Sequence, residues 1–326
     1  MRFGVAGTAA VVVAVVLLMG VRLDSQTSTV LVQEGFNDTS FGARGWYDGA
    51  MSISTAVKYS GAAAMECHFV IGATNCAGGQ WSRHLFTDTD SMYVSFYIKH
   101  SASWVGSGVS YHPHMFIMMT NLDPAYVGGA YTYLTGYIEH NGGVPLLAIQ
   151  DGKNIDETRV GQDLTNVTER RAVAGCNGDS DGYGPGGCYW AGSVHWNSKI
   201  WSAGQVYFDS TPGSTRYKGD WHLVEAYFRL NSVVNGIGAR DGVLQMWYDG
   251  TPIIDRRNVV MRTGAHPTMK FRQFQISPYI GVGSPVDQTY WVDDLLIATA
   301  RPASPPRPPG GGSMLPSAPT NLRIVP

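Results

Sequence analysis

The ten residues SMYVSFYIKH, positions 91–100, alternate between apolar and polar side chains. One face of this segment carries Val94, Phe96 and Ile98, and the other carries Ser95, Tyr97 and Lys99. This alternation is typical of a β-strand with one buried face, because successive side chains of a strand point to opposite sides. The segment therefore predicts a strand whose second face is rich in hydrogen-bonding groups.

A second segment with the same period lies at 223–231 (LVEAYFRLN), and a third begins at Val243. The polar faces of these two segments carry Glu225, Tyr227, Arg229, Asn231, Gln245 and Trp247. The third segment runs into Asp249-Gly250, a dipeptide typical of a tight β-hairpin. Further strands are expected within 30–36, 50–58, 63–70, 115–120, 131–140, 144–150, 271–276 and 289–299.

These short segments, without a long helical period, predict an all-β fold. The expected architecture is a two-sheet jelly-roll sandwich that forms one domain over 26–300. The stretch 154–215 breaks the strand rhythm and is predicted to be a long insertion stapled by a disulfide. Long ordered loops of this kind often carry function.

Composition narrows the classes of function. The chain has 326 residues, a formal net charge of −2 and 15% charged residues, with 40 Gly, 17 Tyr and 9 Trp. The balanced charge argues against a nucleic-acid partner, for which a basic stripe is expected. Its 44% hydrophobic content argues against disorder. Low charge with abundant Gly, Tyr and Trp favours a secreted all-β protein that handles sugar-like ligands.

The two ends are predicted to lie outside the fold. Residues 1–25 have the pattern of a secretory signal peptide, with Arg2 followed by an uncharged run, so the protein is expected to be secreted or at the cell surface. An uncleaved anchor is the alternative and would make the membrane a partner. Residues 301–326 are predicted to be a Pro/Gly-rich linker. Its last stretch, PSAPTNLRIV, resembles the first strand of a fibronectin type III module, with a frayed end as the alternative.

Four cysteines in an exported chain predict two disulfides, most simply Cys67–Cys76 and Cys176–Cys188, although two other pairings remain open. Within the second pair, Asn177, Asp179 and Asp181 place oxygen ligands at alternate positions, as in the first half of a calcium loop. A structural Ca²⁺ site is one interpretation, and an acidic surface turn is the other. No other cofactor is expected.

Three segments carry a resemblance to known proteins: 219–231 (GDWHLVEAYFRLN), 241–250 (DGVLQMWYDG) and 289–297 (TYWVDDLLI). They resemble the C-terminal half of concanavalin A-like jelly-roll proteins, in particular polysaccharide lyases of the alginate and glucuronan lyase type. The resemblance implies that a glycan binds on the concave face of one sheet. Such lyases often carry a Gly-Lys-bearing segment where this chain has YHPH at 111–114, which implies a different catalytic group. The Glu-x-Asp-x-x-Glu pattern of related glucanases is missing, which disfavours hydrolysis by that motif.

β-Elimination on a uronate ring requires a group that neutralises the carboxylate, a base and an acid. The predicted catalytic residues are His112, His114, Tyr97, Tyr227, Lys99 and Arg229. The predicted substrate-binding residues are Asn231, Gln245, Trp247, Glu225, Glu139 and His140. For the two histidines of the YHPH segment, metal binding and plain loop hydrogen bonding remain alternatives.

Two functions are therefore expected, and the sequence does not separate them. The first is a secreted lyase that cleaves uronate-containing polysaccharides by β-elimination. The second is a non-catalytic carbohydrate-binding or adhesion module of a surface protein. Both need a polysaccharide ligand, and neither indicates an oligomeric state.

Overall fold

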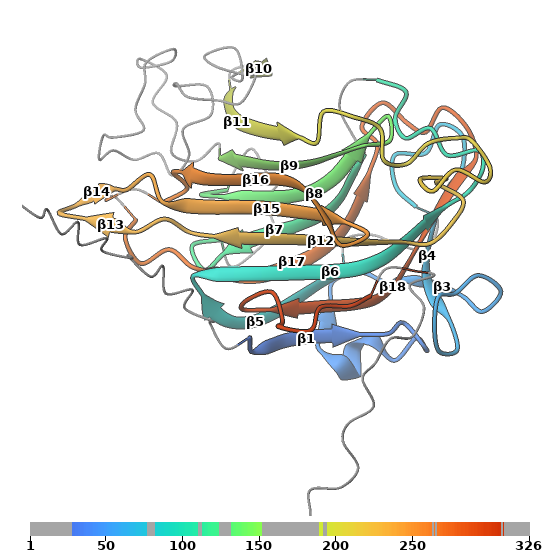
Figure 1. The fold of residues 1–326 in the computed structure, drawn as a ribbon, viewed down its shortest axis with the longest axis horizontal. Helices are drawn as coiled ribbons and strands as arrows, with labels where there is room; N and C mark the ends of the chain where they lie inside the picture. Colours follow the sequence, from blue (N-terminus) through green and yellow to red (C-terminus); the bar gives the residue numbers. More distant parts are fainter. Residues whose placement is uncertain are drawn as a thin grey trace, which may run out of the picture.

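The computed structural model describes residues 28–76, 82–109, 113–123, 132–151, 189–191, 194–262, 264, 266–307 and 309. Over these ranges the chain forms two large antiparallel sheets that pack face to face, as Figure 1 shows. A 3-10 helix, η1 (Phe41–Arg44), is the one helical element in the described part of the chain, and no helix there is long and apolar enough to span a bilayer. The prediction of an all-β, two-sheet jelly-roll sandwich is confirmed.

The first sheet has the strand order β16-β15-β12-β6-β18-β4-β3, and β1 also pairs with β18. Its strands are β1 (Val30–Glu34), β3 (Ser52–Ser54), β4 (Ala64–Phe69), β6 (Ser91–His100), β12 (His222–Arg229), β15 (Gly242–Tyr248), β16 (Thr251–Val259) and β18 (Gln288–Ala298). The predicted strand 91–100 is thus β6, at the centre of this sheet. The strands β12 and β15 follow it in order, so the polar faces expected from their alternation lie side by side.

The second sheet has the order β10-β11-β9-β8-β7-β17-β5-β2. Its strands are β2 (Trp46–Tyr47), β5 (Ser82–Thr89), β7 (His114–Thr120), β8 (Thr135–Asn141), β9 (Val144–Asp151), β10 (Tyr189–Ala191), β11 (Val194–Ser202) and β17 (Phe271–Tyr279). A separate two-stranded ribbon joins β13 (Val233–Val234) and β14 (Ile237–Gly238). Strands β10 and β11 lie inside the stretch predicted as an insertion, and β11 extends the sheet by pairing with β9.

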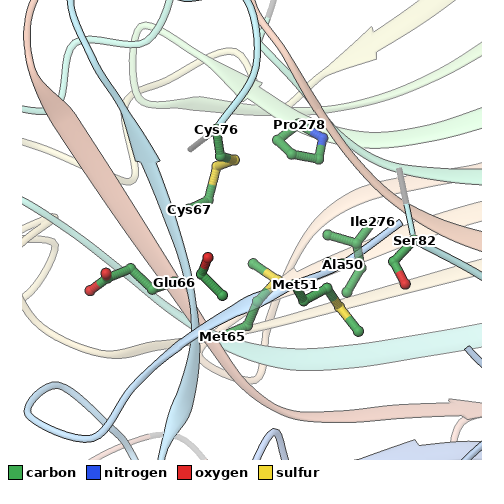
Figure 2. A pocket seen from close by; sticks show the side chains of 10 residues that line it. Ala50, Met51, Met65, Glu66, Cys67, Cys76, Ser82, Ile276 and Pro278 are labelled. Atoms are coloured by element: carbon green, nitrogen blue, oxygen red, sulfur yellow. A yellow bond between two sulfur atoms is a disulfide. The ribbon is translucent and has the colours of Figure 1, made fainter. Parts of the chain in front are cut away.

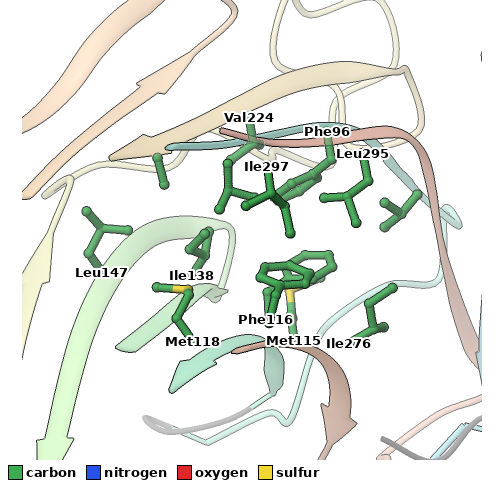
Figure 3. Packing of buried hydrophobic residues seen from close by; sticks show 14 of the residues in the cluster. Phe96, Met115, Phe116, Met118, Ile138, Leu147, Val224, Ile276, Leu295 and Ile297 are labelled. Atoms are coloured by element: carbon green, nitrogen blue, oxygen red, sulfur yellow. The ribbon is translucent and has the colours of Figure 1, made fainter. Parts of the chain in front are cut away.

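The core fills the space between the sheets. Figure 3 shows apolar side chains of the two layers meeting there, with the ring of Phe96 on β6 next to that of Phe116 on β7. These two ring centroids lie 4.4 Å apart. Phe96 and Phe116 are both buried, so each sheet turns one apolar face inward. The other face of the second sheet carries a smaller buried cluster of Ile117, Met119, Tyr137 and Ala148.

The Asp249-Gly250 hairpin expected from the sequence joins β15 to β16. Asp249 has φ 48° and Gly250 has φ 76°, so both central residues of the turn lie in the left-handed region. A two-residue turn of this kind matches the right-handed twist of the strands that it joins. Glycine is the residue that adopts this conformation without steric cost.

The disulfide Cys67–Cys76 is confirmed and ties the end of β4 to the loop that follows, with a Cα–Cα distance of 5.2 Å. Figure 2 shows it as one wall of a pocket. Several predictions lie outside the described residues: the signal peptide 1–25, His112, the pair Cys176–Cys188, and the calcium ligands Asn177, Asp179 and Asp181.

The first residues of the predicted linker lie against the first sheet instead of leaving it. Arg301 makes a two-pronged ion pair with Glu225 of β12, with N–O distances of 2.8 and 2.9 Å. The guanidinium also lies 4.6 Å from the ring centroid of Trp247, and the Arg307 carbonyl accepts a hydrogen bond from the Tyr97 hydroxyl at 2.7 Å. The segment 301–307 is therefore part of the fold.

Replacing Arg301 with alanine is expected to destabilise the protein by about 3 kcal/mol, because the loss of one partner leaves a buried charge uncompensated. The Glu225 side chain is 0% exposed, and it would keep only the hydrogen bond from the Tyr93 hydroxyl. Urea unfolding at neutral pH measures the change.

A matched control is Arg257→Ala, which removes the exposed pair with Asp255 and should cost less than about 1 kcal/mol. If both variants unfold at the same urea concentration, the Arg301 contact does not stabilise the fold. The double variant Arg301→Ala/Glu225→Gln should recover part of the loss, because the buried charge is then removed.

Candidate active site

Eight of the site residues predicted from the sequence lie on or beside the first sheet. The side chains of several of them already form bonds with other parts of the chain. The Tyr97 hydroxyl and the Glu225 carboxylate are bonded to the segment 301–307. Burial is the main cause that raises the pKa of Tyr97, and hydrogen bonding with Tyr59 adds to it, so the hydroxyl stays protonated at neutral pH. The segment 301–307 therefore covers part of the sheet face that was predicted to bind substrate.

The other members of this group are Lys99, Tyr227, Arg229, Gln245, Trp247 and Asn231. Lys99 donates to the Gly219 carbonyl, Arg229 to the Asp241 carbonyl at 3.0 Å, and Gln245 to an Asp255 carboxylate oxygen at 3.0 Å. Tyr227 and Trp247 are partly exposed on the same outer face.

The prediction for Asn231 needs correction, because its amide is fully buried in a structural role. Its oxygen accepts the backbone N–H groups of Met261 and Arg262, at 2.8 and 2.7 Å. Its nitrogen donates to the carbonyls of Arg262 and Ser232. Both ends of the amide are used in fixing this turn, so Asn231 cannot bind a sugar.

The prediction of His140 as a substrate-binding residue also needs correction. On β8 the adjacent residues Glu139 and His140 point to opposite faces, as strand alternation requires. His140 points into the core, where its Nε2 lies 2.8 Å from Nε2 of His100. Glu139 faces the other way, toward His114.

His114, at the start of β7, is the centre of a polar group on the outer face of the second sheet. Its Nδ1 lies 2.5 Å from a carboxylate oxygen of Glu139. Its ring stacks on Tyr137 of β8 at 4.8 Å and lies nearly parallel to the ring of Tyr279 of β17 at 6.2 Å. The imidazole is thus held by a carboxylate and two aromatic rings while its side chain remains 29% exposed.

Strand pairing explains why these residues meet. β7 lies between β8 and β17, and Tyr279 is the direct pairing partner of His114. The register of β17 shifts between Ile276 and Tyr279, which brings the tyrosine opposite the histidine. The arrangement depends on contacts between strands that are far apart in the sequence.

Amide and guanidinium groups continue across the same face. The Tyr137 hydroxyl donates to Gln150 of β9 at 2.8 Å. Gln275 of β17 pairs with Ile117 of β7, which in turn pairs with Tyr137, and on its other side Gln275 pairs with Arg83 of β5. Polar side chains from β5, β8, β9 and β17 therefore lie on this face, with the apolar Ile117 of β7 between Tyr137 and Gln275.

Arg83 is itself fixed by its neighbours. It forms an ion pair with Asp48, lies 5.0 Å from the ring centroid of Tyr47, and donates to Gln273 at 3.5 Å. We call the set on this face the polar cluster; its members are Arg83, His114, Tyr137, Glu139, Gln150, Gln273, Gln275 and Tyr279.

Sequence reasoning named only His114 and Glu139 of the polar cluster. The signal for others was present in FRQFQIS, 271–277, where Gln273 and Gln275 alternate with Phe274 and Ile276. The pocket in Figure 2 is a different place: it is lined mostly by apolar side chains, and the Glu66 carboxylate points away from it.

Comparison with known proteins bears on the fold. No protein-family model matches the sequence, and no curated protein matches it. An alginate lyase from Chlorella virus has a similar structure, with 11% identity, a TM-score of 0.51, and coverage of 83% of this chain and all of its own.

Two further solved structures are similar. An alginate lyase from Aplysia kurodai gives 12% identity, a TM-score of 0.47, and coverage of 83% and 100% of the two chains. An endo-β-1,4-glucuronan lyase from Trichoderma reesei gives 14%, 0.41, and 78% and 88%. The fold is thus one that polysaccharide lyases also adopt, as the sequence resemblance implied, and at these identities the likeness is one of fold alone.

Proposed function

We propose that this protein is a lyase that cleaves uronate-containing polysaccharides by β-elimination at the polar cluster. The observation that carries the proposal is His114, fixed by Glu139 and by the rings of Tyr137 and Tyr279, on an outer sheet face that also bears amide and guanidinium donors. The shared fold supports it as analogy, because one scaffold hosts several functions.

Each requirement of β-elimination has a matching group in the polar cluster. A base removes the proton at C5 of the uronate, the C–H electron pair forms the C4–C5 double bond, and the C4–O4 bond breaks. The leaving oxygen takes a proton from an acid, so no water is consumed. His114 is the proposed base, and Tyr279 or Tyr137 is the proposed acid.

The carboxylate of the sugar must be neutralised, because its negative charge opposes the build-up of a carbanion at C5. Donors aimed at developing charge are among the most effective catalytic devices of enzymes. Arg83 provides a guanidinium donor on this face, and the Gln150 amide lies next to Tyr137. Gln275 is fully buried and its amide nitrogen already donates to Gln273 and Met119, so it supports the face without reaching the sugar. Glu139 orients the imidazole and stabilises it once it is protonated, as the acidic partner of a catalytic histidine does.

The place of action that fits this function is outside the cell. The Cys67–Cys76 disulfide is typical of an oxidising compartment. Secretion and the polysaccharide ligand are parts of the same proposal.

The experiment is an incubation of the purified chain with alginate, glucuronan and other polyuronates, followed by the ultraviolet absorbance of the unsaturated uronate product. Absorbance is expected to rise with at least one polymer. Retention by a polymer without any rise in absorbance across the panel would instead support a carbohydrate-binding module.

A further inference from the structure

The outer face of the first sheet carries a second group of aromatic side chains, far from the polar cluster. Trp291 of β18 pairs directly with Lys99 of β6. Trp221 immediately precedes β12, whose first residue pairs with Ile98, so it lies on the other side of Lys99. Its ring meets that of Tyr59 edge to face, at 5.9 Å. We call Tyr59, Lys99, Trp221 and Trp291 the aromatic platform.

The members of the aromatic platform are partly exposed, yet each is held in place. The Trp291 indole N–H donates to Glu66 at 2.7 Å. Tyr59 stacks on Tyr97 with ring centroids 3.7 Å apart, and its backbone N–H donates to Asp293 at 2.9 Å. The ammonium of Lys99 donates to the Gly219 carbonyl and has further protons to offer.

Fixed, partly exposed aromatic rings around a cation define a particular kind of ligand. The flat rings offer an apolar surface with a polar edge, which suits the C–H faces of sugar rings. A lysine ammonium between them supplies a point charge for a carboxylate. Because the rings are already ordered, little conformational entropy is lost when a ligand binds.

We propose that the aromatic platform is a second binding site for an acidic polysaccharide, separate from the site of cleavage. The proposal rests on the substrate class proposed above, but not on turnover. The platform lies on the outer face of the first sheet, and the polar cluster lies on the outer face of the second sheet. One segment of a polymer chain can therefore bind the platform while another segment occupies the polar cluster.

The test uses the full chain in a His114→Ala background, so that the polymer stays intact, with alginate and glucuronan as probes in affinity electrophoresis. The double variant Trp221→Ala/Trp291→Ala is expected to lose about tenfold in affinity for the polymer that is bound. Tyr133→Ala, which removes a partly exposed ring outside the platform and the polar cluster, is the matched control.

Two further variants separate ring stacking from misfolding. Trp221→Phe/Trp291→Phe should keep most of the affinity, since the flat rings remain. Lys99→Gln should bind the acidic polymers more weakly while leaving retention by a neutral β-glucan unchanged.

Affinity that is unchanged in the double alanine variant overturns the platform. The ultraviolet assay of product is run on the original chain with His114 intact: no turnover there, together with loss of binding in Trp221→Ala/Trp291→Ala, keeps the platform and rejects the lyase. Turnover with unaffected binding keeps the lyase and rejects the platform.

Discussion

Replacing His114 with alanine is expected to lower kcat on a polyuronate by about 10²- to 10⁴-fold, the usual contribution of a positioned acid–base group. The imidazole is the proposed base of the polar cluster, and Glu139 at 2.5 Å holds it in the reactive orientation. The substitution also leaves the Glu139 side chain, 9% exposed, without its imidazole partner, so the urea midpoint should fall, and rates are compared where both proteins are folded by circular dichroism. Initial rates measured by ultraviolet absorbance give the answer.

The matched control for this prediction is His68→Ala. His68 is also partly exposed and also makes a side-chain hydrogen bond, to Thr289 at 3.1 Å, but it lies on β4 of the first sheet. Its loss should leave kcat within about twofold of the original, because surface changes away from a site have small effects. Equal rates for His114→Ala and the original chain would rule out His114 as the base.

Acidification from pH 7.5 to 5 is expected to destabilise the fold through the buried pair His100–His140. Burial, with the neighbouring His140, His222 and Lys218 adding to it, holds the pKa of His100 well below its usual 6.5. Burial lowers the pKa of His140 to about 3. Below about pH 6.5, His100 and His140 therefore bind protons in the unfolded chain but stay neutral in the folded chain.

The sign of the effect follows from this difference. Stability is complete above pH 6.5 and falls as the pH drops from 6.5 toward 3, because the unfolded state then binds more protons. Each histidine contributes up to about 1.4 kcal/mol for every pH unit in that window. Urea unfolding at pH 7.5, 6.5, 5.5 and 5 measures the loss.

The control variant must keep the charged and titratable groups that surround His100 and His140. His222 is engaged with Asp249 and the Tyr217 carbonyl, and the Lys218 ammonium with the Trp104 carbonyl and Ser210. The variant His100→Leu/His140→Leu keeps these groups and should show a much flatter pH dependence. If it unfolds in parallel with the original, the pair is not responsible; if it does not fold, the imidazole resonances of the original should stay unshifted between pH 7.5 and 5.

Strand alternation was enough to predict that residues 91–100 form a strand of an all-β sandwich, and its central place in the first sheet comes from the structure. Period two also placed Tyr97, Tyr227 and Gln245 on one face, which the order β15-β12-β6 confirms. Alternation does not predict that a later segment of the chain covers part of the outer face of the first sheet. That depends on the contact between Arg301 and Glu225, which are 76 residues apart.

Only part of the candidate active site could be predicted from the sequence, because it too depends on contacts between distant segments. His114 stood out in the sequence, but Tyr279 reaches it through pairing between β7 and β17 and a register shift that no local pattern reveals. The error at His140 was avoidable, because Glu139 and His140 are neighbours on a strand and cannot share a face.

The central claim, β-elimination at the polar cluster, is tested most directly by the masses of the oligosaccharides that the chain releases from a polyuronate. Every product that carries a newly formed non-reducing end is expected to be lighter by one water than the corresponding hydrolysis product, and these products should disappear in His114→Ala. New non-reducing ends with the mass of hydrolysis, or elimination that persists undiminished in His114→Ala, would contradict the proposal.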